Sequence, residues 1–202
     1  MILGLYTASD QTIDRIVEHP VLIWQLDPPD DSESGIIQPH RKPKWGLVSR
    51  ILGKSKQPRR PAEPPELDVT SDERNITDLD KAWHGIHFLL TGSAWEGDPP
   101  LNFLVCGGRK VGDIDIGYGP ARVFRAIEVH GISCALSIFS PEVLKERFDP
   151  VRMTQEDIYP TIWNRDPSED DALGYLLEYF AVLKDFVQKA ADRNLGLVIT
   201  IE

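Results

Sequence analysis

An aspartate and two histidines recur at helical spacing in one short stretch of the sequence. Asp80, His84 and His87 occupy positions i, i+4 and i+7, so a helix running through them places all three on one face. A carboxylate beside two imidazoles suits general acid–base catalysis or the binding of a metal ion, and these three are our candidate catalytic residues. The alternative is structural, because a histidine beside a buried helix is commonly a hydrogen-bonded group of the core.

A zinc site would need at least one ligand beyond these three side chains. The spacing selects none of the other available ligands, which are Cys106, Asp113, Asp115 and His130. We therefore predict no bound metal and no cofactor. Cys106 has no neighbouring base, and the chain lacks a Gly-x-Ser-x-Gly elbow, so nucleophilic catalysis is disfavoured as well.

A glycine-rich stretch precedes Arg122. Its glycines match neither the P-loop nor the dinucleotide-binding fingerprint, so tight turns explain them better. Arg122 is a candidate anion ligand through its bidentate guanidinium, with a structural salt bridge as the alternative. Four large aromatic residues are candidates for lining a ligand pocket, although packing in the core or at an interface suits them at least as well. They are Trp83, Tyr118, Tyr159 and Trp163.

The helix that would carry the histidines is the clearest of the first half of the chain. Its apolar pattern runs over residues 77–91, with Thr77 and Asp80 as a capping box and Gly92 as the stop. Between residues 92 and 120, glycine and proline recur too often for long regular elements. Arg122 is therefore expected to follow a loop-rich face, which is where binding residues commonly sit.

Helices also dominate the second half. Residues 123–139 predict one helix, and Ser140, followed by proline, caps the next. A helical turn over residues 154–157 follows. The last helix has the strongest signals, because Asp166 caps it and Glu169 completes a capping box. Acidic residues also lie near its start and basic residues near its end, which matches the helix dipole.

Strands are predicted at both ends of the chain. Residues 2–8 form an apolar run of β-formers, and Ser9 then caps a helix that ends before Pro20. Residues 195–201 predict a second strand, which pairs most simply with the first. The fold class is therefore α+β, a mostly helical single domain with a small sheet that includes the N- and C-terminal strands.

The composition is that of one ordinary globular domain. The 202 residues include 32 acids and 22 bases, which gives a net charge of −10, and 41% are hydrophobic. The sequence has neither the apolar run of about 18 residues that a membrane span needs nor a secretion signal. We expect a soluble, cytoplasmic protein in which Cys106 and Cys134 are free thiols.

One segment has the opposite charge. Residues 36–62 contain eight bases and no acid, which leaves 14 bases against 32 acids, a net charge of −18, in the rest of the chain. We interpret residues 36–65 as a basic, proline-flanked insertion or loop. Three roles are open: folding back on the acidic body, meeting nucleic acid or anionic lipid, and binding a protein partner through a short amphipathic helix. Trp45, Arg50 and Lys54 are the expected partner contacts.

The histidine-bearing stretch also carries a family resemblance. Residues 79–92, Leu-Asp-Lys-Ala-Trp-His-Gly-Ile-His-Phe-Leu-Leu-Thr-Gly, resemble the signature of the YfbM-like family, small bacterial proteins classed as a domain of unknown function. Later blocks agree in order, at 117–122, 147–150 and 158–163. The resemblance is loose over residues 1–26, good over 77–202 and absent over 36–62. It implies a compact α/β-type domain and bacterial cytoplasmic residence, and no agreed activity.

Three functions follow as expectations. The first is a non-catalytic protein-binding module, since no catalytic motif is present and an acidic body attracts cationic proteins, as it does in toxin-neutralising immunity proteins. The second is an enzyme acting on a small anionic substrate, with His84 or His87 as acid/base and Arg122 as anion anchor. The third is binding of nucleic acid or an anionic membrane surface through residues 36–62.

Overall fold

The structure of the protein is a computed structural model. It describes residues 1–26, 66–67, 69–70, 73–166, 168 and 170–202. The basic segment at 36–62 lies outside these residues, together with its predicted helix and the expected partner contacts Trp45, Arg50 and Lys54. The interpretation of residues 36–65 as an insertion therefore stays a prediction.

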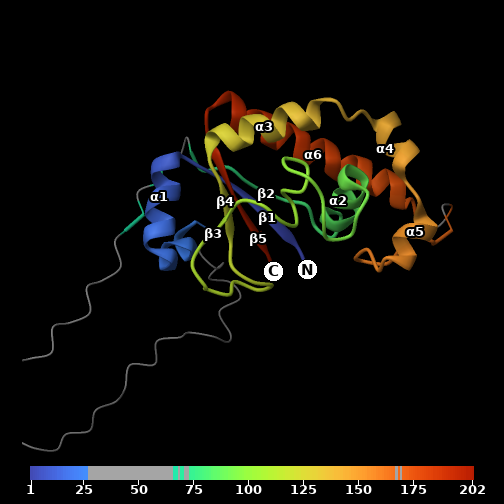
Figure 1. Cartoon of the computed structure of the whole chain (residues 1–202), viewed down its shortest axis with the longest axis horizontal. Coiled ribbons are helices and arrows are strands. Elements are labelled where there is room, and N and C mark those ends of the chain that lie inside the picture. The colour runs from blue at the N-terminus through green and yellow to red at the C-terminus, as the bar shows by residue number, and fades with distance from the viewer. Residues whose placement is uncertain (27–65, 68, 71–72, 167, 169) are drawn as a thin grey trace, which may run out of the picture.

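A five-stranded antiparallel sheet organises the described residues, with the order β2-β1-β5-β4-β3. The strands span Leu3–Ala8 (β1), Ile76–Asp78 (β2), Arg109–Lys110 (β3), Arg122–Phe124 (β4) and Gly196–Ile201 (β5). The two ends of the chain thus lie side by side in the middle of the sheet (Figure 1). The predicted terminal strands, their pairing and the α+β class are confirmed.

Alternation along the strands gives the sheet two faces. Leu5 of β1 and its partner Ile199 of β5 face a large core built with three helices. These are α2 (Trp83–Thr91), α3 (Ala126–Ser137) and α6 (Ala172–Asp192). Tyr6 and its partner Val198 face the opposite side, where a smaller core packs against α1 (Asp10–Glu18) and the 3-10 helix Pro20–Gln25.

Local signals fixed several helix starts as predicted. The Ser9 hydroxyl accepts the Thr12 N–H at 3.2 Å at the start of α1, and Ser140 caps α4 (Pro141–Arg147) in the same way. Gly92 ends α2 in the left-handed conformation, with φ of 75°.

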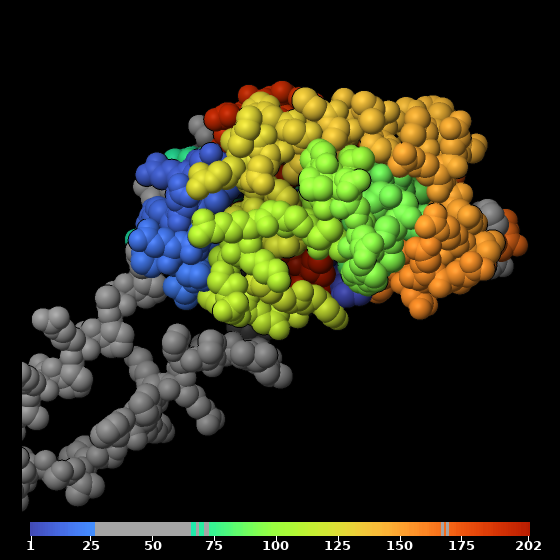
Figure 2. All heavy atoms as spheres, in the orientation of Figure 1, coloured from blue at the N-terminus to red at the C-terminus, as the bar shows by residue number. Residues whose placement is uncertain are grey.

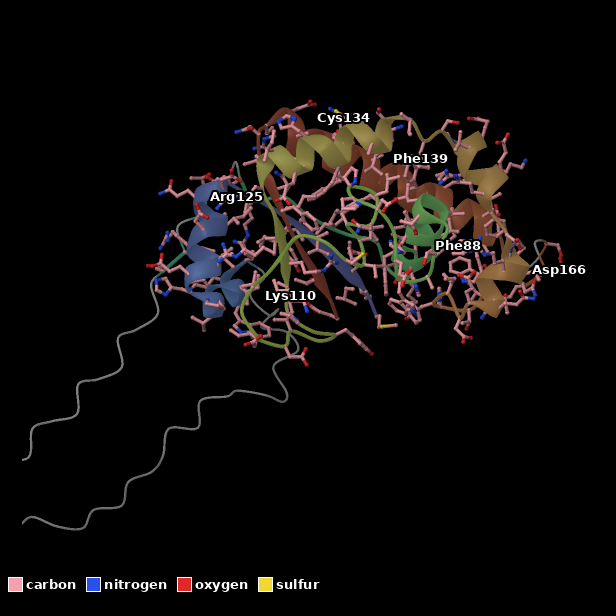
Figure 3. All side chains as sticks on the ribbon, in the orientation of Figure 1. Phe88, Lys110, Arg125, Cys134, Phe139 and Asp166 are labelled. Atoms are coloured by element: carbon pink, nitrogen blue, oxygen red, sulfur yellow. The ribbon has the colours of Figure 1, made fainter. Side chains whose placement is uncertain are left out.

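Cys134 lies on the outer side of α3 (Figure 3), and both cysteines are free, as expected.

The predicted helix over residues 77–91 begins too early. Thr77 belongs to β2, where it pairs with Leu5, and α2 begins only at Trp83. Asp80 has a φ of 41°, which no helical residue adopts, and the Thr77–Asp80 capping box is therefore wrong. Pairing with the N-terminal strand outweighs the local helical pattern here.

Two further boundaries differ from the prediction. Residues 123 and 124 belong to β4, because this strand pairs with the central β5, and α3 begins only at Ala126. The last helix is capped by Asp171, whose side chain accepts the Gly174 N–H at 2.8 Å. Asp166 instead accepts hydrogen bonds from Ser168, so its assignment as the helix cap is wrong.

A short helix, α5 (Pro150–Gln155), replaces the predicted turn over 154–157, because Asp149 caps it through the Arg152 N–H. In the described part of the chain no single helix is both long and apolar enough to cross a membrane. The pair α3 and α4 reaches that length and composition only together, across a bend of 79°.

Candidate functional site

The structure does not bring the predicted triad together. Asp80 precedes α2, and its carboxylate accepts a hydrogen bond from the Tyr175 hydroxyl at 2.9 Å. His84 and His87 do lie on α2, where both are fully buried. No three metal-ligating side chains gather into a metal site among the residues that the structure describes.

Both nitrogens of His84 are occupied by backbone groups. Nδ1 accepts the Tyr159 N–H at 3.0 Å, so Nε2 carries the proton of the neutral ring and donates it to the Ala94 carbonyl at 2.7 Å. Trp83 stacks on the imidazole at 4.9 Å, and Trp95 lies 4.3 Å away. Burial lowers the pKa of His84, which keeps the ring neutral.

His87 has a similar setting with one nitrogen unused. Its Nε2 lies 3.1 Å from the Glu96 carbonyl, whereas its buried Nδ1 has no hydrogen-bond partner among the described residues. Burial, followed by the nearby charges of His84 and Arg122, lowers the pKa of His87 to about 4. Together the two imidazoles hold residues 94–96 against α2.

Arg122 holds a later part of the same loop in place. Its side chain leaves β4 on the core face and donates to the carbonyls of Phe103 and Cys106 at 2.8 Å and to that of Leu104 at 2.6 Å. No described acid forms a salt bridge with it. Burial lowers its pKa to about 10, so the guanidinium keeps its charge at neutral pH and uses it on backbone carbonyls.

The four candidate aromatics do not form one pocket. Trp83 and Trp163 belong to the core, and the Trp163 indole donates to the Ile158 carbonyl at 2.6 Å. Tyr159 is half-buried and its hydroxyl accepts from the N-terminal amine at 3.0 Å, whereas Tyr118 is 65% exposed on the glycine-rich segment that precedes β4. Figure 2 shows the loop that follows α2, in green and lime, covering this side of the molecule between α1 and α5.

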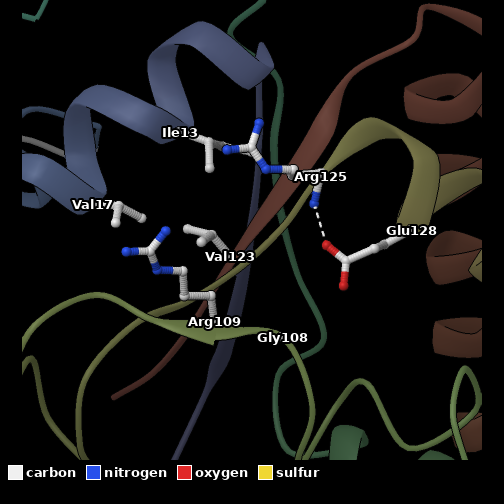
Figure 4. Close-up of a pocket in the computed structure, with 7 residues that line it drawn as sticks. All are labelled: Ile13, Val17, Gly108, Arg109, Val123, Arg125 and Glu128. Carbon is white, nitrogen blue, oxygen red and sulfur yellow. Dashed lines mark hydrogen bonds between the residues drawn. The ribbon is translucent and has the colours of Figure 1, made fainter.

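One cavity of about 280 Å³ lies between α1 and the edge of the sheet (Figure 4). Arg109 and Arg125 flank it, with Val123 between them. Arg125 forms ion pairs with Asp10 and Asp14, which neutralise its charge. Arg109 is then the remaining cation among the described residues that line the cavity, and a single exposed guanidinium does not define a ligand site.

A second cavity, of about 360 Å³, lies at the C-terminal end of α2. Arg147 donates to the carbonyls of Leu89 and Leu90 at 2.9 and 3.0 Å, and Arg152 donates to that of Gly92 at 2.7 Å. Both arginines therefore satisfy the carbonyls that a helix end leaves free. Arg152 also lies over the ring of Phe88, which is labelled in Figure 3, at 5.1 Å from its centroid. These cations are structural.

A third site is a groove on the sheet, and unlike the two cavities flanked by arginines it is bordered by apolar side chains. Two cavities, of about 390 and 30 Å³, share Tyr6, Thr200 and Glu202, and we call them together the sheet groove. Three apolar side chains at its border are about half exposed, namely Ile2 (45%), Trp24 (48%) and Ile76 (50%). Single exposed apolar residues are ordinary, whereas several around one groove make it a candidate interaction surface.

Gly4 lies in the lining of the groove, where the side chains of Tyr6 and Thr200 leave no room for another. Gly4 lies between Asp78 of β2 and Thr200 of β5 in the register of the sheet. A Cβ at Gly4 would lie 2.8 Å from the Thr200 hydroxyl and 3.1 Å from that of Tyr6, so no larger residue fits there without a shift. The Thr200 hydroxyl is buried and has no hydrogen-bond partner among the described residues.

The groove is also acidic. Asp78 and Glu202 are the charged side chains among the described residues that line it. Sequence reasoning missed it because an apolar run such as residues 2–8 is typical of a buried strand. Alternation in that run, with Leu3 and Leu5 on one face and Ile2, Gly4 and Tyr6 on the other, was the available signal.

Comparison with known proteins places this fold in a family. A model of the DUF1877 domain of unknown function matches residues 1–200. The chain belongs to the DUF1877 family. Among solved structures, the crystal structure of a protein of unknown function, YfbM from Escherichia coli, is similar with a TM-score of 0.62 and 15% identity over 98% of each chain. This likeness shows the DUF1877 fold alone, and it confirms the YfbM-like resemblance. No curated protein matches the sequence.

Proposed function

We propose that this DUF1877 protein is a non-catalytic protein-binding module whose partner docks in the sheet groove. The observation that carries the proposal is that Ile2, Trp24 and Ile76 are about half exposed where they border the sheet groove. Apolar side chains gain free energy by leaving water, so a partner that covers these three side chains would be stabilised by their burial.

The charge of the groove indicates the chemistry of the partner. Asp78 and Glu202 are among the described residues that line it, and the whole chain has a net charge of −10. Such a surface attracts cationic proteins and speeds their association. Neutralisation of a basic toxin is one form that this function takes, and cytoplasmic residence would accord with it.

The two other functions have less support. An enzyme that used His84 or His87 with Arg122 would need these groups free, and all three are buried and hydrogen-bonded to backbone carbonyls. Binding of nucleic acid or an anionic membrane through residues 36–62 rests on their charge alone.

The test compares two variants with the same added charge. The purified chain is incubated at low salt with extract of its own cells, and retained basic proteins are identified and purified. Ile76→Lys, at the groove, should abolish binding of the partner so found, because a cation repels a basic segment. Ile138→Lys is the control, since Ile138 is 72% exposed at the end of α3, on the other side of the sheet. Retention of no basic protein, or equal loss in both variants, would refute the proposal.

A further inference from the structure

His84 holds a turn of the chain through a hydrogen bond that only its neutral ring can make. The Tyr159 backbone N–H can only donate, so the Nδ1 that accepts it at 3.0 Å carries no proton. The other ring nitrogen, Nε2, donates to the Ala94 carbonyl at 2.7 Å. A second proton on the ring would go to Nδ1 and would set one donor against another. Protonation of His84 therefore breaks the hydrogen bond to Tyr159 and keeps the one to Ala94.

His87 differs from His84 in this respect. Its Nε2 lies 3.1 Å from the Glu96 carbonyl, and its Nδ1 has no hydrogen-bond partner among the described residues. A proton added to that Nδ1 would break no hydrogen bond to the described part of the chain. Of the two imidazoles, His84 is thus the one whose protonation costs a contact between distant segments.

The surroundings of the two rings do not compensate a positive charge. Both rings are fully buried, and no described acid forms an ion pair with either of them. A buried imidazolium without a carboxylate partner is costly, so protonation favours opening of the contact. The segments packed around the rings carry two cations, one phenol and two exposed carboxylates, namely Arg122, the Met1 amine, Tyr159, Glu96 and Asp157.

The turn that His84 holds is strained and is fixed at both ends. Ile158 before it and Trp163 after it are buried in the core, at 0% and 2% exposure. Thr161 has a φ of 64°, in the left-handed region that a β-branched residue rarely adopts. Such a conformation persists where surrounding contacts hold it, and the hydrogen bond to His84 is one of these contacts. Residues 159–161 can therefore change position while the core on either side stays folded.

We infer that His84 is an acid-sensitive latch, whose neutral ring holds residues 159–161 against α2 and whose protonation releases them while the sheet stays folded. Burial lowers the pKa of His84, so the latch is closed at neutral pH and opens only in acid. The latch is independent of the proposed docking in the sheet groove and would exist without it.

NMR of the full chain follows both events in one titration from about pH 7 to about pH 4. The nitrogen chemical shifts of the His84 ring report its protonation. Amide exchange, corrected for its intrinsic dependence on pH, reports the hydrogen bond of Tyr159. Protection of the Tyr159 amide should fall about fivefold or more, the effect of about one hydrogen bond, with the midpoint of the His84 ring. The amides of β5 should keep their protection at that midpoint.

Three results would overturn the latch. The first is a Tyr159 amide that stays protected while the His84 ring takes up its proton. The second is a fall that follows the protonation of the His87 ring. The third is loss of protection in β5 before or together with that of Tyr159, because the chain then unfolds as a whole.

Two matched substitutions assign the effect to one ring. His84→Asn places an amide oxygen near the position of Nδ1, and this acceptor does not titrate. Protection of the Tyr159 amide should then be the same at both ends of the titration, whereas His87→Asn should keep the fall. A fall in His84→Asn as large as in the unmodified chain would contradict the latch. Circular dichroism shows whether each variant folds, and the shared midpoint in the unmodified chain decides if His84→Asn does not.

Discussion

The His84 imidazole acts as a connector between three parts of the chain. Its ring belongs to α2, accepts a hydrogen bond from the Tyr159 N–H and donates one to the Ala94 carbonyl. A group with both nitrogens bonded to backbone cannot exchange a proton without losing one of these bonds. The spacing of His84 and His87 is compatible with catalysis and with scaffolding, and the partners of the two rings favour scaffolding.

Acid should destabilise the protein through His87. Its folded-state pKa of about 4 lies below the ordinary value of 6.5, so the unfolded chain binds the proton first as the pH falls. The stabilising contribution is complete above about pH 6.5, declines as the pH falls toward 4, and then levels off, for a loss of about 3 kcal/mol. Urea unfolding across this pH range measures it.

Two variants assign the effect to this residue. His87→Gln should reduce the decline of the unfolding free energy but not remove it, because burial shifts the pKa of His84 in the same direction. His130→Gln removes an exposed imidazole and should leave the decline as it is. A decline of the same size in His87→Gln and the unmodified chain would show that His87 is not its source.

Among the elements, α2 is packed so closely that its glycine has a structural role. A Cβ at Gly85 would lie 2.7 Å from both Leu176 of α6 and the Trp163 ring. Gly85→Ala should therefore destabilise the fold by about 1–3 kcal/mol through overpacking, although alanine is the better helix former. Thermal or urea unfolding provides the measurement.

The matched control is another helical glycine. Gly131 of α3 has no heavy atom within 4 Å of the Cβ position. Gly131→Ala should stabilise the protein by about 0.5–1 kcal/mol, because only the gain in helix propensity remains. Equal effects of the two substitutions would contradict the close packing of α2 against α6.

Elements whose signals are local could be predicted from the sequence. The caps at Ser9 and Ser140 and the stop at Gly92 depend on neighbours a few residues away. By contrast, the local sequence predicts helix at Thr77 and Val123, and both lie in strands because they pair with Leu5 and Val198, which are remote in sequence. The pattern of apolar residues around Thr77 and Val123 carries no information about these pairing partners.

At the scale of the molecule, the same remoteness explains why the candidate site was missed. The sheet groove combines Gly4, Asp78 and Thr200, three residues in one row of the sheet that are far apart in the chain. The terminal strands and their pairing were predictable, and they bring the groove together. Its hollow, its acidity and its unpartnered hydroxyl could be recognised only once β2 was known to lie beside β1.

The charge division of the whole chain leads to a last prediction. Replacing the eight bases of residues 36–62 by Gln changes the net charge from −10 to −18. A basic partner of the groove should then associate about threefold faster or more at about 20 mM salt, because long-range attraction grows with charge. At about 0.5 M salt, where the Debye length is only a few ångströms, the difference should vanish. Stopped-flow or surface association rates test this, and equal rates at low salt would contradict it. If the unmodified chain binds duplex DNA or anionic vesicles and the Gln variant does not, residues 36–62 instead serve as a nucleic-acid or lipid contact.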